Sequence, residues 1–295
     1  MDMKNLEKIN NLPLELVTEI LSCLPIKPLL RFKCVSKSFY NVINSPDFVK
    51  LHLSRSLQAR GGTLIVSAYI CIHTFDFSDS PCHATKLYYP DNDDQFRILV
   101  GSCNGLLCFS CQADEVTLLN PATRACKSLP KITLTNMYRD YRTPLGFGYD
   151  CISDDYKILR CARLRVSYAG MPEWETFLYS YKTNVWESIQ NPPWTWESVI
   201  SSPGIVANNS LHWMSCDFKE WNSLYINFCR MHLGLSVACS KDGSKILVAL
   251  MGDEQNFICC DLKSKEATKI QIPGLPPQSP VILPWVESLV PLSDD

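Results

Sequence analysis

Cysteines and histidines are the side chains of this sequence that could bind a metal ion. Cys108 and Cys111 have the two-residue spacing of a zinc-binding pair, but no second pair accompanies them. The cysteine and histidine at 71 and 73, and those at 82 and 83, do not have the spacing of a known zinc site. The sequence therefore predicts no metal ion and no cofactor. We interpret the fifteen cysteines as small apolar residues that pack between strands.

No set of residues predicts an active site either. The chain lacks a Gly-x-Ser-x-Gly elbow, a phosphate-binding loop and a His-Glu-x-x-His helix. We expect His212 on a strand near a core, and we interpret Asp154 and Asp155 as solvated acids of a turn rather than as a catalytic pair. Trp194 and Trp196 are interpreted as core anchors, with a ligand-facing loop as the alternative. No catalytic residue is therefore predicted.

The composition indicates a soluble, folded protein of two units. Its 28 basic and 30 acidic residues nearly balance, so we expect no binding to nucleic acid by the chain as a whole. No stretch is predicted to span a membrane, and the first eight residues lack the apolar core of a secretory signal, which predicts a cytoplasmic or nuclear location. Residues 1–60 hold nine basic and five acidic side chains, whereas the remaining 235 hold nineteen and twenty-five.

The first unit has the pattern of several short helices. One helix is predicted from Leu12 to the residue before Pro25, and after a loop over 25–28 a second is predicted over 29–35. Ser36 can cap a third helix, and Ser45 followed by proline and aspartate is typical of the start of a fourth. The first helix is amphipathic, with apolar residues at Leu14, Leu16, Val17, Ile20, Leu21 and Leu24.

This helical unit is more apolar than its size requires. From Leu12 to Leu51, 21 of 40 residues are Leu, Ile, Val, Phe, Tyr or Cys. A fold of about 40 residues buries too small a fraction of its surface to hide them all. We therefore expect part of this surface to meet a partner, and the alternative is that the helices dock on the rest of the chain.

The segments from Leu12 to Pro25 and from Lys27 to Phe39 resemble the F-box, in the form found in plants. Two Leu-Pro pairs and the Cys-Val-Ser-Lys run at 34–37 carry the resemblance. Pro28 stands where the family usually has serine, and Phe39 where it usually has tryptophan. The resemblance predicts an F-box domain over residues 8–55.

The F-box family binds the adaptor Skp1, which connects it to a cullin and a RING subunit of a ubiquitin ligase. The resemblance implies that some of the matching apolar residues contact Skp1 and others form the small core of the F-box. These residues are Leu12, Pro13, Leu16, Ile20, Leu24, Pro25, Leu29, Leu30, Cys34 and Val35. Four nearby cations would meet an acidic partner or form an ordinary solvated face: Lys27, Arg31, Lys33 and Lys37.

The rest of the chain has the pattern of short strands separated by turns. Runs such as 63–72, 96–103 and 245–250 are rich in β-forming residues. The segments 118–129, 178–189 and 259–270 share an order of strand, polar residue, turn and strand, with Asn120, Ser180 and Asp261 as the polar residues. A hairpin that recurs in this way is typical of propeller blades.

Several phrases of this second unit resemble the F-box-associated domain of plant F-box proteins. They lie at 101–108, 118–124, 146–150, 153–157, 179–186, 211–213 and 286–292. The segment that follows Trp213 resembles a later part of the family pattern, so about one blade is predicted to be missing. The fold class predicted is α+β multidomain: a small helical F-box, then an all-β, propeller-like domain over residues 60–292.

The function implied by this resemblance is substrate recognition in a ubiquitin ligase of Skp1, cullin and F-box subunits. The chain would bind Skp1 through the F-box and an unknown protein substrate through the β domain, without catalysing a reaction itself. The alternatives are a Skp1-bound scaffold or inhibitor that does not support ubiquitination, and an enzyme built on a propeller.

Overall fold

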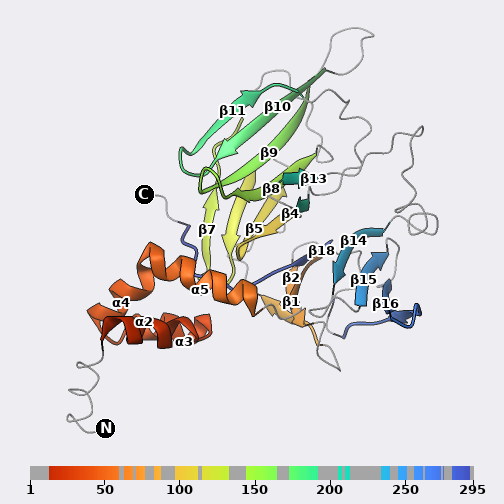
Figure 1. Ribbon diagram of the computed structural model, residues 1–295. Coiled ribbons are helices and arrows are strands. Elements are labelled where there is room, and N and C mark those ends of the chain that lie inside the picture. Colours follow the sequence, from red (N-terminus) through yellow and green to blue (C-terminus); the bar gives the residue numbers. More distant parts are fainter. Residues whose placement is uncertain are drawn as a thin grey trace.

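The computed structural model shows a group of helices packed against a set of β-sheets (Figure 1). The helices are α2 (Leu14–Ser22), α3 (Ile26–Phe32), α4 (Lys37–Asn44) and α5 (Pro46–Gln58). Helix α5 lies between the other helices and the sheets (Figure 1). The structure describes residues 13–59, 63–68, 71–76, 83–87, 97–111, 115–132, 144–164, 173–191, 205–207, 210–212, 234–239, 245–250, 256–261, 263–273, 275 and 281–292.

Two helix starts confirm the capping signals in the sequence. The Ser36 hydroxyl accepts a hydrogen bond from the backbone N–H of Phe39 at 3.1 Å, at the start of α4. The Ser45 hydroxyl accepts one from the N–H of Phe48 at 3.3 Å, at the start of α5. Pro46 is the first residue of α5, where its missing N–H has no helical partner to lose.

Helix α3 begins and ends earlier than predicted. The expected loop over 25–28 is already helical from Ile26, and the helix ends at Phe32 rather than at Val35. Pro28 is the third residue of the helix. The N–H groups of the first turn have no acceptor within a helix, so a proline at this place does not interrupt it.

The β domain contains four sheets of four antiparallel strands and one sheet of two strands among the described residues. The first four-stranded sheet has the order β18-β1-β2-β3, and the others have the orders β4-β5-β6-β7, β11-β10-β9-β8 and β14-β15-β16-β17. Strands β12 and β13 form the two-stranded sheet. The strands are β1 (Thr63–Ala68), β2 (Cys71–Asp76), β3 (Thr85–Leu87), β4 (Arg97–Cys103), β5 (Leu106–Cys111), β6 (Val116–Asn120), β7 (Ala125–Ser128), β8 (Leu145–Asp150), β9 (Asp155–Leu164), β10 (Glu173–Ser180), β11 (Val185–Ile189), β12 (Ile205–Ala207), β13 (Ser210–His212), β14 (Gly234–Cys239), β15 (Lys245–Leu250), β16 (Asn256–Asp261), β17 (Ala267–Ile270) and β18 (Val281–Pro284).

The sheets are arranged like the blades of a propeller. Strand β18 from the end of the chain pairs with β1 from the start of the domain, so the first blade joins both ends of the domain. One edge strand of each blade faces its neighbour: β18 contacts both β4 and β14, and β4 contacts β8. Strand β8 in turn contacts β12. This arrangement confirms the predicted order of a helical unit followed by a propeller-like β domain.

Two expectations about the strands have different outcomes. The run 63–72 was predicted as one strand, but it contains β1 and the first residues of β2, which pair with each other as a hairpin. The blade predicted to be missing stays a prediction. Trp213 and the residues up to 233 lie outside the described residues, and the neighbouring sheet of β12 and β13 has two strands in the described part of the chain.

The three recurring hairpins predicted from the sequence are confirmed. They are the pairs β6–β7, β10–β11 and β16–β17. In each, the polar residue (Asn120, Ser180 or Asp261) accepts a hydrogen bond from a backbone N–H two or three residues later. The last residue of each turn has a left-handed backbone, with φ of 62° at Arg124, 56° at Asn184 and 61° at Lys265.

The helical unit and the β domain share apolar contacts. Val49 and Leu53 of α5 pack against a core of the β domain that contains Tyr179 and Val290. Leu289, which follows the last strand, is buried in the core of the helical unit. Each unit therefore completes the core of the other.

Candidate functional site

The helical unit leaves several large apolar side chains exposed. Leu16 and Ile20 of α2 are 51% and 57% exposed, and Val35, which follows α3, is 62% exposed. Leu16 and Ile20 are four residues apart and so lie on one face of α2. The other face packs inward through Val17 and Leu21. Exposed side chains of this size and number are typical of a protein-binding surface.

The structure separates the apolar residues predicted to bind Skp1 into three groups. Pro13, Leu16, Ile20, Pro25, Cys34 and Val35 are exposed. Leu24 and Leu30 are half-buried, and Leu29 is fully buried. Leu12 lies outside the described residues. The separation shows that the exposed group can meet a partner, whereas Leu29 serves the internal core.

Two exposed apolar residues were missing from the predicted set. Leu14 is 55% exposed at the first position of α2, and Tyr40 of α4 is 53% exposed. Leu14 was part of the amphipathic pattern but was not distinguished from its inward neighbours. For Tyr40, the signal in the sequence is its spacing from Val42 and Ile43, two and three residues later, which pack in the core.

A compact core holds the exposed residues in place. Leu21, Ile26, Leu29, Ile43 and Phe48 are buried together, and Leu289 joins them from the end of the chain. Phe39, at the position where the family usually has tryptophan, packs edge-on against Phe32 with ring centroids 6.0 Å apart. An aromatic residue is thus kept at this position in a core role.

Polar contacts fix α2 against α5. The Arg55 guanidinium donates to the backbone oxygen of Glu19 at 3.2 Å and forms an ion pair with the Glu19 carboxylate. It also donates to the Ser22 hydroxyl. The hydrogen bond with Glu19 raises the pKa of Arg55 further. His52 Nε2 donates to the backbone oxygen of Leu24 at 2.9 Å. These contacts determine the direction in which the exposed face of α2 points.

The cations expected near the F-box surface are mostly exposed. Lys27, Arg31 and Lys37 are exposed, and Lys33 is half-buried. Burial lowers the pKa of Lys33, because the charged amine loses part of its hydration. Both interpretations, an electrostatic partner surface and a solvated face, remain compatible with this arrangement.

The residues considered for chemistry have structural positions. Within the described part of the chain, no group of three or more metal-binding side chains is found. Cys108 and Cys161 are buried, as expected for apolar packing, but Cys23, Cys34, Cys126 and Cys151 are exposed, so that interpretation fails for them. The side chain of His212 and residues Trp194 and Trp196 lie outside the described residues.

We expected both Asp154 and Asp155 to be solvated, but only Asp154 is partly exposed, and Asp155 is buried. Asp154 is the last residue of the turn between β8 and β9, and Asp155 is the first residue of β9. The turn follows the pattern of the recurring hairpins, with Asp150 as its polar residue and φ of 52° at Asp154. Asp155 is buried and accepts hydrogen bonds from the Ser180 hydroxyl at 2.6 Å and the Lys182 N–H at 3.0 Å. Its carboxylate therefore joins two neighbouring turns.

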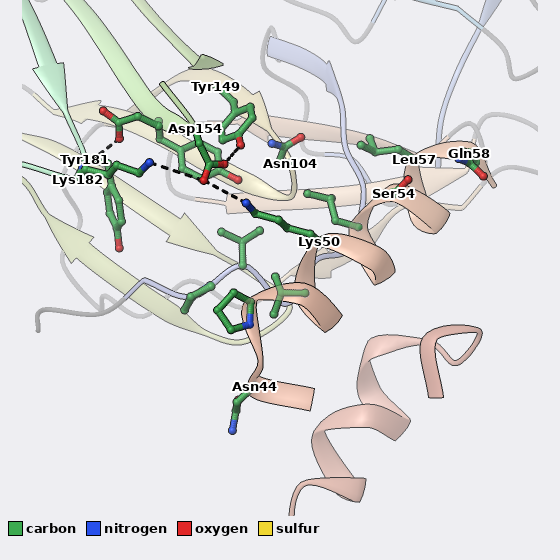
Figure 2. A pocket seen from close by; sticks show the side chains of 17 residues that line it. Asn44, Lys50, Ser54, Leu57, Gln58, Asn104, Tyr149, Asp154, Tyr181 and Lys182 are labelled. Atoms are coloured by element: carbon green, nitrogen blue, oxygen red, sulfur yellow. Dashed lines mark hydrogen bonds and ion pairs between the residues drawn. The ribbon is translucent and has the colours of Figure 1, made fainter. Parts of the chain in front are cut away.

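A groove of about 810 Å³ lies between α5 and the turns of the β domain (Figure 2). Its apolar wall includes Leu53, Leu57 and Tyr156. At one end, the Asp154 carboxylate contacts Lys50 of α5 (Figure 2). The hydrogen bond from the Tyr149 hydroxyl, and next the contact with Lys50, lower the pKa of Asp154. Burial and the same hydrogen bond raise the pKa of Tyr149 to about 12.

Comparison with known proteins identifies both units. The family model described as "F-box associated beta propeller domain" matches residues 63–233, and the model described as "F-box domain" matches residues 9–51. The chain belongs to the F-box proteins with an associated propeller domain. Helices α2 to α4 and the first part of α5 lie in the matched F-box, and strands β1 to β13 lie in the matched propeller region.

Proteins of Arabidopsis thaliana are similar to this chain. The chain is 30% identical over 232 residues to "F-box protein CPR1", covering 69% of this chain and 53% of the relative. It is 30% identical over 220 residues to "F-box/kelch-repeat protein At3g23880", covering 69% and 58%. The chain spans about half the length of the curated relatives that it matches. Among the described residues, no helix is both long and apolar enough to cross a membrane.

Proposed function

We propose that this F-box protein is a substrate-recognition subunit of a ubiquitin ligase of Skp1, cullin and F-box subunits. The F-box would bind a Skp1-like adaptor, and through it the cullin and RING subunits. The propeller would hold a protein substrate. The observation that carries the proposal is the exposed apolar surface of Leu16, Ile20, Val35 and Tyr40, on a unit whose other side is already packed against the propeller.

The chemistry assigned to this protein is proximity rather than catalysis. Holding a substrate lysine near a charged ubiquitin-conjugating enzyme raises its effective concentration at that enzyme. The protein would act where its partners act, in the cytoplasm, the nucleus or both. The alternative, a Skp1-bound scaffold or inhibitor, shares the same docking surface and differs only in whether ubiquitin transfer follows.

The test is capture of a purified Skp1-like protein by the full chain. We expect the double variant Leu16→Glu with Ile20→Glu to lose binding. Burying one leucine contributes about 1.5–3 kcal/mol, which corresponds to roughly a ten- to hundredfold change in Kd. Both side chains are exposed, so the variant should keep the circular dichroism spectrum and melting temperature of the wild type.

The matched control is Ile152→Glu. Ile152 is 88% exposed on the turn between β8 and β9, so this variant likewise places a glutamate on an exposed apolar residue, but in the propeller. It should bind the adaptor like the wild type. Equal binding by the wild type and the α2 double variant would contradict the docking surface. Adaptor binding without ubiquitin transfer, in a reconstituted ligase with a bound substrate, would favour the scaffold or inhibitor.

A further inference from the structure

An electrostatic contact spans the junction between the F-box and the propeller. Lys50 Nζ lies 3.1 Å from Asp154 Oδ2, and Lys182 Nζ lies 3.7 Å from the same oxygen. The Tyr149 hydroxyl donates to the other carboxylate oxygen, Oδ1. Figure 2 shows the two lysines approaching Asp154 from opposite sides, one from α5 and one from the neighbouring turn. The carboxylate therefore joins an F-box helix to two turns of the propeller.

The turn itself does not require an aspartate at position 154. The equivalent last positions of the other turns hold Arg124, Asn184 and Lys265, all with the same left-handed backbone. Residues of quite different charge thus adopt this conformation in the same chain. The negative charge at position 154 is explained by what it contacts outside its own turn, namely Lys50, Lys182 and Tyr149.

Apolar packing and the ion pair make different contributions at this junction. Val49 and Leu53 of α5 pack against the propeller core, and this contact holds the two units together. The groove beside them leaves part of α5 without close packing. Lys50 and Asp154 have side chains that are 63% and 45% exposed, so their ion pair adds little to stability. Complementary charges do, however, fix the register of two surfaces that are already in contact.

We propose that Asp154 is a positioning residue that sets the orientation of the propeller on the F-box through Lys50, and thereby the place at which a bound substrate meets the ubiquitin-conjugating enzyme. The proposal rests on the proposed function, because orientation matters only where ubiquitin is transferred. Lys182 and Tyr149 hold the Asp154 carboxylate in the direction of α5.

The first test measures the junction itself in the full chain bound to a Skp1-like protein. Lys50 and Lys182 approach the same oxygen, so a short amine-reactive cross-linker should join them, and mass spectrometry quantifies the product. We expect Asp154→Asn to lower this yield about two- to fivefold, the range for loss of an exposed ion pair. The matched control is Glu115→Gln, which breaks the ion pair of Glu115 and Lys131 (2.6 Å) away from α5 and should leave the yield unchanged.

The second test measures positioning in a reconstituted ligase with cullin, RING subunit, conjugating enzyme and ubiquitin. The readout is which propeller lysines present in both the wild type and the variants receive ubiquitin, so the lysine introduced at position 154 is not counted. Asp154→Lys should spread the modification over more lysines, and the charge exchange Lys50→Glu with Asp154→Lys should restore the wild-type distribution. Lysine at position 154 is compatible with the turn, since Lys265 holds the equivalent position.

The outcomes separate this proposal from the proposed function. Skp1 capture should be the same for the wild type and all these variants. If the wild type did not capture Skp1, that result would refute the docking function instead. An unchanged cross-link yield in Asp154→Asn, or an unchanged ubiquitin distribution in Asp154→Lys, would overturn the positioning role. Failure of the charge exchange to restore the distribution would do the same.

Discussion

At the scale of single residues, the side chain of Asn120 connects parts of the chain that are far apart in sequence. Its Oδ1 accepts hydrogen bonds from the N–H groups of Ala122 and Thr123 in its own turn. Its Nδ2 donates to the backbone oxygens of Ser288 at 3.0 Å and Val290 at 2.8 Å. An amide is the side chain that can accept on one side and donate twice on the other, whereas an ionised carboxylate can only accept.

Exchanging Asn120 for aspartate separates these two roles. Asp261 shows that aspartate can accept the hydrogen bonds of such a turn. In Asn120→Asp the turn should therefore persist, but the buried carbonyl groups of Ser288 and Val290 lose their donor and face a carboxylate. We expect the free energy of unfolding to fall by about 2–4 kcal/mol, measured by chemical denaturation.

The control for this variant is Asp261→Asn, which makes the reverse exchange in an equivalent turn. Asp261 forms hydrogen bonds within its own turn, with the N–H groups of Lys263 and Ser264. Its exchange should change the free energy of unfolding by less than about 0.5 kcal/mol. If both variants lost equally little stability, the donor role of Asn120 would be unimportant.

Gly105 shows which residue requirements a sequence can and cannot reveal. The Asn-Gly pair at 104–105 predicts a tight turn, and both residues do have positive φ, 52° and 83°. The second requirement on Gly105 is spatial. A Cβ atom here would overlap the Ser288 hydroxyl oxygen, and the Trp285 indole N–H donates to the Gly105 oxygen at 3.1 Å. Contacts with a segment so distant in sequence leave no local pattern.

At the scale of elements, hydrophobic periodicity and caps predicted the helices well. The capped starts of α4 and α5 are confirmed because serine at the N-cap and proline at the first position act locally. The start of α3 was missed because Pro28 was interpreted as the end of a loop, although proline is also tolerated in a first turn. For α2, periodicity gave the apolar residues but did not show that Leu14 and Leu16 stay exposed while Leu21 is buried.

The last segment, residues 285–292, is an element that local patterns could not assign. It follows β18 without being a helix or a strand. Trp285 packs in a core with residues of the first two blades, whereas Leu289 is buried among the F-box helices. The segment thus links the first two blades to the F-box.

Shortening Leu289 should weaken the F-box specifically. Leu289→Ala leaves a cavity among Ile26, Leu29 and Phe48, and such truncations cost about 2–5 kcal/mol. We expect faster hydrogen exchange in α3 and α4, measured by mass spectrometry. The matched control is Leu129→Ala, which removes an equally buried side chain from a propeller core. It should destabilise the propeller without a selective increase in α3 and α4. The opposite pattern would place Leu289 outside the F-box core.

At the scale of the whole molecule, the first blade combines strands from both ends of the β domain. Strand β18 pairs with β1, and the segment after β18 returns the chain to the F-box. The recurring hairpins predicted the blades, but their unequal spacing of 60 and 81 residues could not predict how many blades there are. Blade order depends on contacts between edge strands, such as β14 with β18, that sequence periodicity does not contain.

Several ionisable groups are neutral and buried in this assembled core, or half-buried beside it as Cys103 is. Burial raises the pKa of the Cys103 thiol from its usual 9.0 to about 11, and that of Tyr179 from 10.0 to about 12. Burial also raises the pKa values of Cys108 and Cys161. These groups must ionise in the unfolded chain before they ionise in the folded one. Their contribution to stability is therefore complete below the usual pKa and is lost as the pH rises toward the folded pKa.

This protein should consequently lose stability in mildly alkaline solution. One pKa unit corresponds to about 1.4 kcal/mol, so we expect the melting temperature to fall by roughly 4 °C or more between about pH 8 and pH 10.5. Cys103→Ala removes a thiol whose pKa is raised to about 11, the lowest of the raised pKa values given above. The fall in melting temperature should therefore be smaller in this variant. The exposed Cys126 provides the control, because Cys126→Ala should leave the fall unchanged. If the melting temperatures of the wild type and Cys103→Ala fell equally with rising pH, Cys103 would not contribute to the alkaline loss of stability. A thiol that is neutral in the folded protein and ionises on unfolding must make stability depend on pH.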